Sequence, residues 1–192
     1  MIEDLIRKNR SCRRFHQDHT IELKTLEGLV NLARLSASAA NLQPLKYTLS
    51  CNSEINARIF SCLAWAAYLK DWPGPKEGER PSSYIIICGD TRISKDIDCD
   101  HGIAGQSILL GAREKGLAGC MLGAVNRKKL RKILKLPAYL KILLVIAMGK
   151  PKEVATIETL GPNGNIQYWR DDKGVHHVPK RSLNDIIVDS YN

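Results

Sequence analysis

A short segment near the N-terminus concentrates groups that bind anions. Residues 9–15 read N-R-S-C-R-R-F, which places three arginines and a serine within a few positions of one another. Guanidinium groups bind phosphate oxygens through paired hydrogen bonds that each contribute roughly 1.5 to 3 kcal/mol. Arg10, Ser11 and Arg13 therefore predict a loop that can hold a phosphorylated, electron-rich ligand. For this segment taken alone, a solvated basic loop is the alternative.

A second segment, 36–47, reads S-A-S-A-A-N-L-Q-P-L-K-Y and combines small side chains with two amides. Small residues such as Ser38 let a flat ligand lie close to the backbone. The amides of Asn41 and Gln43 each donate and accept hydrogen bonds, which suits hydroxyls and the edges of a polar ring. A plain helix-to-strand loop is the alternative for this segment.

Two further stretches complete a recognisable set. Residues 100–123 begin D-H-G-I-A-G-Q-S and end G-L-A-G-C-M-L-G, and residues 168–181 read Y-W-R-D-D-K-G-V-H-H-V-P-K-R. Residues 9–15, 36–47 and 100–123 follow, in this order, the motifs R-R-S-x-R-x-F, P-S-x-x-N-x-Q-P-W-x-F and D-x-G-x-A-x-Q-x-x-x-L-x-A-x-x-x-G-L-G. The chain thus resembles the FMN-dependent nitroreductase family, over residues 1–190 with a weak stretch at 53–98.

The resemblance implies a role for each group. Arg13 is expected to face the pyrimidine edge of FMN and to stabilise the negative charge that develops there on reduction, which makes it the catalytic candidate. Arg10 and Ser11 are expected to hold the phosphate or the ribityl chain. The other expected cofactor-binding residues come from the small-residue loop of a partner subunit, from the segment passing the flavin ring and from the basic C-terminal stretch: Ser38, Asn41, Gln43, Gly119, Cys120, Met121, Lys180 and Arg181.

Some positions depart from the family pattern. Asn9 stands where many members have an arginine, so one phosphate cation is missing, and Lys180 or Arg181 can compensate. Leu45 replaces the usual tryptophan after Q-P, and Tyr47 supplies the aromatic ring nearby. These departures change details of the match, but the small residues of 36–47 still let a flat ligand lie close to the backbone.

The implied activity is the reduction of a small, flat acceptor such as a nitroaromatic or a quinone. NADH or NADPH reduces the bound FMN, the nicotinamide leaves, and the acceptor is reduced in the same pocket. The implied assembly is an intertwined homodimer with its two FMN sites at the interface. A flavin enzyme of another outcome (reductive dehalogenation or flavin consumption) and a non-catalytic basic binding protein are the alternatives.

Charge and composition limit the other classes of function. Much of the net charge of +9 lies between Arg127 and Lys135, where apolar residues at helical spacing indicate a helix with a solvated basic face. Nucleic-acid motifs are lacking, so we expect no nucleic-acid partner. The start of the chain carries acids and the longest apolar run, 142–148, is short, so we expect neither a signal peptide nor a membrane span. Six scattered cysteines then indicate free thiols in a cytoplasmic protein.

Competing chemical motifs are weak. The sequence lacks G-x-G-x-x-G and G-x-x-x-x-G-K-[ST], which excludes the usual dinucleotide and P-loop fingerprints. His16 and His19 could be half of a metal site but have no partner pattern, so no metal is expected. Cys12 is a possible redox thiol because neighbouring arginines would lower its pKa. The pair His176 and His177 is interpreted as structural.

Periodicity and turn residues predict the elements that must position these groups. Helices are expected up to Asn9, after a Thr20 cap, at 55–69, at 101–115, from an Asn126 cap to Pro137, and after a Ser182 cap with Leu183, Ile186 and Ile187 inward. Strands are expected at 46–51, 84–88 and 142–148, with a hairpin at 166–170 and 175–178. Residues 71–81, rich in proline and glycine, predict a loop of the kind that often covers a site. The expected fold is α+β and nitroreductase-like: one domain, 1–192, with a mixed, largely antiparallel sheet flanked by helices.

Overall fold

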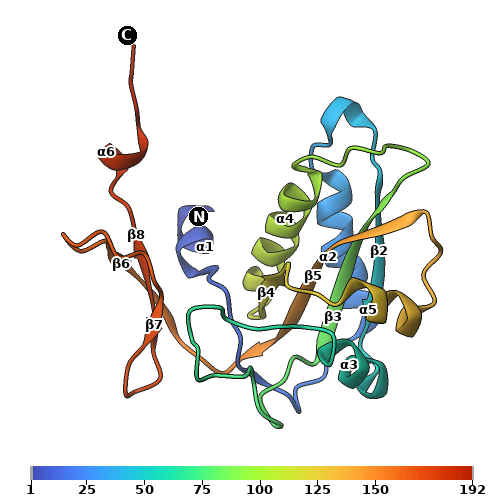
Figure 1. Ribbon diagram of the computed structural model, residues 1–192, viewed down its shortest axis with the longest axis horizontal. Helices are drawn as coiled ribbons and strands as arrows, with labels where there is room; N and C mark the ends of the chain where they lie inside the picture. Colours follow the sequence, from blue (N-terminus) through green and yellow to red (C-terminus); the bar gives the residue numbers. More distant parts are fainter. Residues whose placement is uncertain (1, 192) are drawn as a thin grey trace.

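The centre of the molecule is a five-stranded sheet, all of whose strand pairs are antiparallel (Figure 1). The structure is a computed structural model and describes residues 2–191. The spatial order of the main strands is β1 (Phe15–His16), β5 (Leu140–Pro151), β3 (Ser83–Asp90) and β2 (Leu45–Ser50), and β4 (Ala118–Leu122) pairs with β5 on the same edge as β1. The long β5 therefore has β3 on one side and both short strands on the other.

Four helices cover the two faces of this sheet. They are α2 (Leu23–Leu35) and α4 (Asp100–Glu114) on one face, and α3 (Ser53–Phe60) and α5 (Arg127–Leu134) on the other. Strand β3 is buried along its whole length because successive side chains enter opposite cores. Ile85 and Ile87 pack with α2 and α4, whereas Tyr84, Ile86 and Cys88 pack against the opposite layer. Burial on both faces explains the continuous apolar run in this strand.

The C-terminal part forms a smaller, separate sheet. Its strands are β6 (Ala155–Thr159), β8 (His176–Lys180) and β7 (Trp169–Arg170), with β6 parallel and β7 antiparallel to β8. The short helix α6 (Leu183–Ile186) follows β8, and the first helix, α1 (Ile2–Lys8), contacts α4 and β6. Figure 1 shows the C-terminal segment extending away from the central sheet. The predicted hairpin is confirmed, with a first strand shorter than expected and a second strand that extends to Lys180, and the parallel strand β6 was not predicted.

Local sequence signals fix several ends of helices. Asn52 caps α3 by accepting the backbone N–H of Ile55 at 2.9 Å, and Asn126 caps α5 by accepting that of Lys129 at 3.0 Å. Gly116 follows α4 with a φ of +70°, the left-handed conformation that closes many helices. The predicted cap at Thr20 is wrong, because α2 is preceded by Glu22, which makes no side-chain capping bond.

The predicted helix at 55–69 is also wrong beyond its first half. It ends at Phe60 because the next backbone groups pair with a distant loop. The N–H of Ala64 donates to Ala124 at 3.0 Å, and that of Asn126 donates to Cys62 at 2.8 Å. These long-range bonds replace the bonds that would continue the helix.

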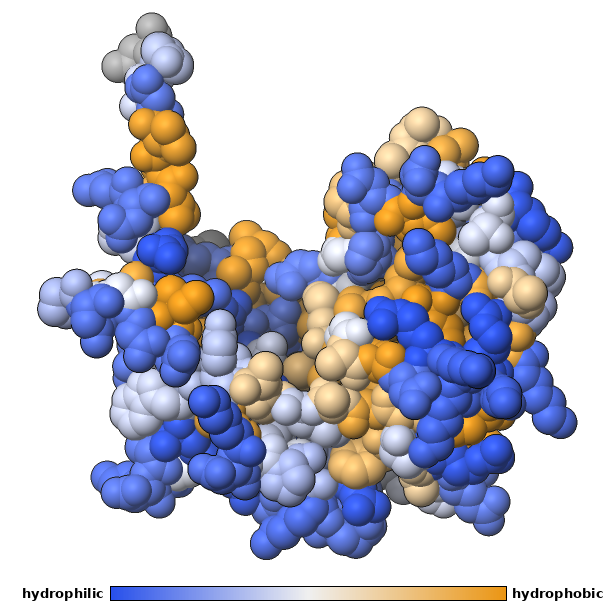
Figure 2. Space-filling model, viewed as in Figure 1, coloured by the Kyte–Doolittle hydropathy of each residue, from blue (hydrophilic) through white to orange (hydrophobic). Residues whose placement is uncertain are grey.

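The terminal helix has the predicted cap but not the predicted burial. Ser182 and Asp185 form a capping box. However, Leu183, Ile186 and Ile187 are at least half exposed and do not point into a core. Figure 2 shows apolar side chains along this projecting segment, so within one chain nothing covers them. In α4, Gly111 serves a core contact, since it lies directly against Leu29 and Leu32 of α2, whereas Gly102 is exposed.

No helix among residues 2–191 is both long and apolar enough to cross a membrane.

Candidate functional site

The arginine-rich segment connects α1 to β1 and runs beside β4. The backbone N–H of Cys12 donates to the carbonyl of Gly119 at 3.0 Å, which ties the segment to that strand. Arg10 turns back and donates to the carbonyl of Ile6 at 2.8 Å, at the end of α1 where carbonyls lack helical partners. These two bonds hold the segment against β4 and the end of α1.

We call the space at this junction the arginine cavity, of about 320 Å³. It is lined by side chains from the arginine segment, from α4 and β4, and from the C-terminal hairpin: Asn9, Arg10, Ser11, Arg13, Gln106, Leu109, Met121, Tyr168, His176, Val178 and Lys180. The structure thus brings together Arg10, Ser11, Arg13, Met121 and Lys180 of the predicted site.

Arg13 is held from several directions and is only 8% exposed. Its backbone N–H donates to a carboxylate oxygen of Glu153, and its guanidinium lies 4.9 Å from the ring centre of Tyr168. One terminal nitrogen, Nη1, lies 3.2 Å from Nε2 of His176. Glu153 also accepts a hydrogen bond from Arg170 at 2.8 Å, which joins the segment to β7. The C-terminal hairpin therefore forms a large part of the surroundings of Arg13.

His176 is neutral in this arrangement. An arginine can only donate, so Nε2 of His176 must be the acceptor and the ring proton must be on Nδ1. Burial, together with the charges of Arg13 and Arg170, lowers the pKa of His176 to about 4. The neighbouring His177 has the opposite surroundings, since hydrogen bonds to Glu158 and Asp171 raise its pKa.

The residues around the arginine cavity carry hydrogen-bond donors without acceptors. Nε of Arg10, Nε of Arg13 and Nδ1 of His176 are all buried, and none has a hydrogen-bond partner within residues 2–191. A buried donor without an acceptor costs about 1 to 3 kcal/mol. These donors belong to residues that line the arginine cavity, and the same lining supplies the charges of Arg10, Arg13 and Lys180, which suits a ligand rich in acceptor oxygens or nitrogens.

The small-residue loop is organised by Asp100, the first residue of α4. Ser38 donates to this carboxylate at 2.6 Å, and the backbone N–H of Ala39 donates to its other oxygen at 2.9 Å. The N–H of Gln43 in turn donates to the hydroxyl of Ser38 at 3.0 Å. The hydroxyl of Ser38 therefore shapes the loop in this structure.

The loop also has an unusual backbone. Ala40, Asn41 and Gln43 have φ values of +47°, +53° and +51°, in the left-handed region that residues other than glycine seldom adopt. Such strain occurs often at functional sites. The amide of Gln43 donates to Asn41, and both side chains are exposed at the surface.

The two halves of the predicted site are separate within one chain. Ser38 and Gln43 line a cavity of about 210 Å³, together with Lys46, Tyr47 and Asp100. This loop cavity and the arginine cavity have no lining residue in common.

The predicted ring-facing segment is a regular strand, β4. Gly119 is packed so closely that an added Cβ would lie 2.7 Å from the carbonyl oxygen of Ala147. Cys120 is buried, and burial raises its pKa. Only Met121 of these three lines the arginine cavity.

The suggestion that arginines activate Cys12 is wrong. Burial raises the pKa of this thiol to about 12, with a further contribution from the charge of Glu153. At the C-terminal end, Lys180 reaches the arginine cavity, whereas Arg181 is exposed and does not line it.

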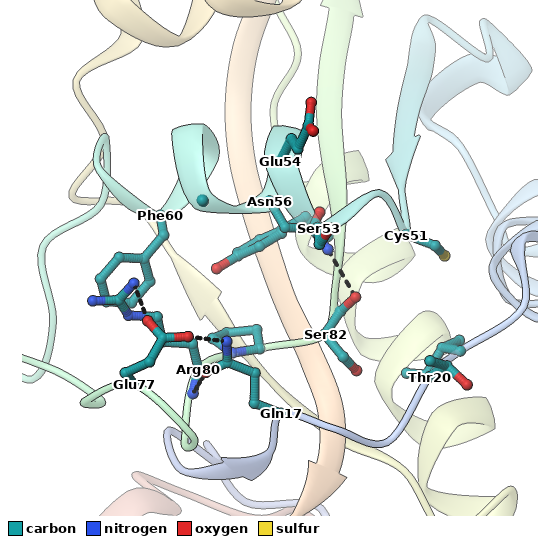
Figure 3. A pocket seen from close by; sticks show the side chains of 14 residues that line it. Gln17, Thr20, Cys51, Ser53, Glu54, Asn56, Phe60, Glu77, Arg80 and Ser82 are labelled. Carbon is teal, nitrogen blue, oxygen red and sulfur yellow. Dashed lines mark hydrogen bonds and ion pairs between the residues drawn. The ribbon is translucent and has the colours of Figure 1, made fainter.

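A third cavity, of about 370 Å³, lies at the start of β3 near the predicted covering loop (Figure 3). Two of its charged residues are paired: Arg80 contacts Glu77 at 2.6 Å and stacks on Phe60 with its guanidinium 4.4 Å from the ring centre. The buried Nε of Arg80 has no hydrogen-bond partner within residues 2–191. The amide of Asn56 is bonded to Ser50 and to the carbonyl of Ser82. None of the predicted site residues lines this cavity, and the 71–81 loop belongs here and not to the arginine cavity.

Across the described chain, His, Cys, Asp and Glu side chains form no group of three that could hold a metal ion. His16 and His19 lie instead at a turn, where the N–H of His19 donates to the carbonyl of His16.

The sequence interpretation missed Tyr168, His176 and Glu153. Tyr168 and His176 were assigned to the hairpin, and His176 was interpreted as structural, because nothing local connects them with Arg13. The available signal was the mixture of aromatic and basic residues in 168–181. This composition does not predict which of these side chains point toward Arg13.

Comparison with known proteins identifies the family and the fold of this chain. The sequence matches the Nitroreductase family over residues 6–150. A relative from Archaeoglobus fulgidus, provisionally named NADH dehydrogenase/NAD(P)H nitroreductase, is 27% identical over 73% of this chain and 80% of its own length. The structure resembles an FMN-dependent nitroreductase from Clostridium difficile (TM-score 0.66, 23% identity, 81% and 90% covered) and a Nitroreductase Family Protein from Streptococcus pneumoniae (TM-score 0.69, 16% identity, 99% and 100% covered). The structural likenesses establish the fold.

The family match spans the arginine segment, the small-residue loop, α4 and β4, which contribute to the lining of the arginine cavity or the loop cavity. Because this match extends over more than half of the 192 residues, the chain belongs to the nitroreductase family.

Proposed function

We propose that this protein is an FMN-dependent oxidoreductase that uses NADH or NADPH to reduce a small, flat acceptor such as a nitroaromatic or a quinone. The observation that carries the proposal is the arginine cavity, where buried donors on Arg10, Arg13 and His176 lack acceptors in the described chain. The names of the similar proteins, which mention FMN and NAD(P)H, support the choice of cofactor and electron donor.

The donor set fits FMN. This cofactor has a dianionic phosphate and a ring edge with acceptor atoms that becomes negative on reduction. The arginine cavity offers fixed positive charge from Arg10, Arg13 and Lys180, and among its lining residues there is no carboxylate. A bound FMN supplies the exchange of a hydride between the nicotinamide and the acceptor.

The residues of this chain then have distinct tasks. Arg13, which is buried and held by Glu153 and His176, stabilises negative charge at the pyrimidine edge. Its fixed orientation means that the donor need not reorganise during the reaction. Arg10, Ser11 and Lys180 bind the phosphate end, and Met121 and Leu109 provide an apolar wall for the ring.

We further propose that the second half of the site comes from another copy of the same chain. The loop of Ser38, Asn41 and Gln43 does not reach the arginine cavity of its own chain. The exposed apolar side chains of the C-terminal segment would be covered in such a homodimer (Figure 2). Each pocket then combines the arginines of one subunit with the amides of its twin, on a single domain spanning 1–192.

The contacts of α5 argue against the alternative that this protein is a non-catalytic basic binding protein. Arg127 donates to the carbonyls of Ile142 and Leu143, and Arg131 donates to those of Pro137 and Leu140. These contacts tie α5 to β5 and to the turn between them, so two of the six basic residues between Arg127 and Lys135 have a structural task.

The visible spectrum of the purified protein tests the proposal directly. We expect flavin absorbance bands, or their appearance after FMN is added, and loss of the bands on anaerobic addition of NADH or NADPH. A colourless protein that takes up no FMN would contradict the proposal, and so would bound flavin that neither nucleotide reduces. Mass spectrometry of the flavin after reoxidation by air distinguishes simple turnover from consumption of the cofactor.

A further inference from the structure

The contact between Arg13 and His176 joins the two parts of the chain. Arg13 lies within the region matched by the family, whereas His176 lies in the C-terminal sheet beyond it. Their side chains meet at 3.2 Å, and both residues are buried, with exposed fractions of 8% and 1%. A contact of this kind is screened little by water.

We propose that His176 is a positioning residue for Arg13: its Nε2 accepts a hydrogen bond that fixes the direction of the guanidinium toward the cofactor. This inference rests on the proposed function, because it assigns Arg13 to the flavin. It adds a residue from the C-terminal hairpin to the machinery of the site.

The surroundings of His176 favour such a role over simple packing. A histidine between Arg13 and Arg170 has to remain uncharged, and its Nδ1–H has no acceptor within the described chain. Both features cost stability, whereas an apolar residue at this position in β8 would avoid them. What the imidazole supplies in exchange is an acceptor for Arg13.

The other contacts of Arg13 do not restrict rotation of its guanidinium group within its own plane, and the contact with His176 does. Glu153 binds only the backbone N–H of Arg13, and the ring of Tyr168 supports the face of the guanidinium. Neither contact fixes the direction in which the N–H groups point within the plane of the guanidinium. The remaining contact, to the carbonyl of Ser11 at 3.5 Å, is long. His176 therefore provides the acceptor that sets this direction.

Two amide substitutions of His176, which differ in the reach of their side-chain oxygen, test whether its Nε2 acts as an acceptor for Arg13. In His176→Gln the side-chain oxygen can reach the position of Nε2, whereas in His176→Asn the amide reaches only the position of Nδ1. We expect His176→Gln to bind FMN within about threefold of the wild type and His176→Asn to bind it roughly tenfold or more weakly, as loss of a hydrogen bond to a charged group predicts. The measurement is fluorescence titration of the apoprotein with FMN, alongside its thermal midpoint. Equal affinities for the two variants, with equal thermal midpoints, would overturn the proposal.

The control variant is His177→Gln, on the next residue of the same strand. Its ring stacks on Trp169 at 4.0 Å and pairs with Glu158 and Asp171, with no contact to Arg13. We expect this change to lower the thermal midpoint while FMN affinity stays within about threefold. A large loss of FMN affinity in His177→Gln would mean that any damage to the hairpin weakens binding, and would overturn the specific role of His176.

A mutant cycle shows whether His176 acts through Arg13. We expect His176→Asn to weaken FMN binding in the wild type but to have less than a twofold effect when Arg13 is already alanine. Equal losses in both backgrounds would show an independent action and contradict the proposal.

Nitrogen NMR of the apoprotein tests the contact without any flavin. We expect His176 to be the Nδ1–H tautomer with an unprotonated, hydrogen-bonded Nε2, and the Nε2 signal to move in Arg13→Ala. An Nε2–H tautomer would overturn the inference whether or not the protein binds FMN. Conversely, the expected tautomer in a protein that takes up no FMN would contradict the proposed function and leave the contact established.

Discussion

The guanidinium of Arg13 and the imidazole of His176 meet at 3.2 Å, although 163 positions separate them in the chain. The first residue follows α1 and the second lies in the last strand, so this contact exists only when the C-terminal sheet folds back on the arginine segment. Glu153 strengthens the same junction by accepting the backbone N–H of Arg13 and the side chain of Arg170. The most buried cation of the arginine segment is thus held by residues more than a hundred positions away in the chain, with separations of 140 and 163.

Replacement of Arg13 tests its proposed role at the cofactor. We expect Arg13→Ala to weaken FMN binding by roughly ten- to a hundredfold, because one charge-assisted hydrogen bond contributes about 1.5 to 3 kcal/mol. We expect Arg13→Lys to recover only part of this loss, since an ammonium group cannot present paired N–H groups. Fluorescence titration and the rate of flavin reduction by NADPH measure both effects. Unchanged flavin affinity and unchanged reduction rate in Arg13→Ala would remove Arg13 from the site.

Mixing of two inactive variants tests the shared pocket. We expect Arg13→Ala and Gln43→Glu each to retain little FMN, because each one damages a different half of the site. Co-expressed together, they should form mixed dimers with one intact pocket, which restores about a quarter of the wild-type sites. Flavin content of the dimer fraction after gel filtration measures this recovery.

The matched control combines two variants of the same half, Arg10→Ala and Arg13→Ala. This mixture should recover nothing, because every arginine cavity then carries one defect. Equal recovery in both mixtures, or a monomer that keeps its flavin, would contradict the shared pocket.

Two glycines near β4 test the packing of the strand that passes the site. At Gly119 an added Cβ would lie 2.7 Å from the oxygen of Ala147, a backbone atom that cannot move away easily. We expect Gly119→Ala to lower the free energy of unfolding by about 1 to 3 kcal/mol. Gly123 has no atom within 4 Å of its Cβ position, so Gly123→Ala should change stability by less than about 1 kcal/mol. Urea unfolding of both variants gives the comparison, and equal losses would argue against the close packing of β4.

The pair of Arg14 and Glu79 predicts a loss of stability in acid. Arg14 donates to both carboxylate oxygens of Glu79, at 2.8 and 2.6 Å, and lowers the pKa of this buried carboxyl to about 2. Because the folded pKa lies below the unfolded value, the stabilisation is complete above about pH 4.5 and is lost as pH falls toward 2. We expect Glu79→Gln to lower the free energy of unfolding at pH 7 by on the order of 2 kcal/mol and to flatten the curve between pH 4.5 and 2.

The control for this change is Glu3→Gln. Glu3 pairs with Arg7 at 2.9 Å, but both side chains are exposed, so its loss should change stability by less than about 1 kcal/mol. Chemical unfolding at several pH values measures both variants. An unaltered acid limb in Glu79→Gln would contradict the assignment.

Much of the secondary structure was predictable because its causes are local. The side chains of Asn126 and Ser182 cap helices that start where the sequence predicts them, since each cap bonds to a backbone N–H within three residues. The apolar run of β3 likewise identified a strand buried on both faces. The cap at Asn52 was not predicted, and α3 starts at Ser53, two residues before the predicted start. The helix predicted at 55–69 does not continue past Phe60, because the backbone groups of Cys62 and Ala64 form hydrogen bonds with the loop at 124–126.

The candidate site divides in the same way. The sequence by itself determined the kinds of group available: guanidinium groups at Arg10 and Arg13, and amides at Asn41 and Gln43. Only the tertiary structure decided their surroundings. It brought His176 to Arg13, buried the thiol of Cys12 so that its pKa rises, and engaged Arg131 with carbonyl groups. The physical reason is range: caps and periodicity act over a few residues, whereas burial and charge depend on which distant segments exclude water together.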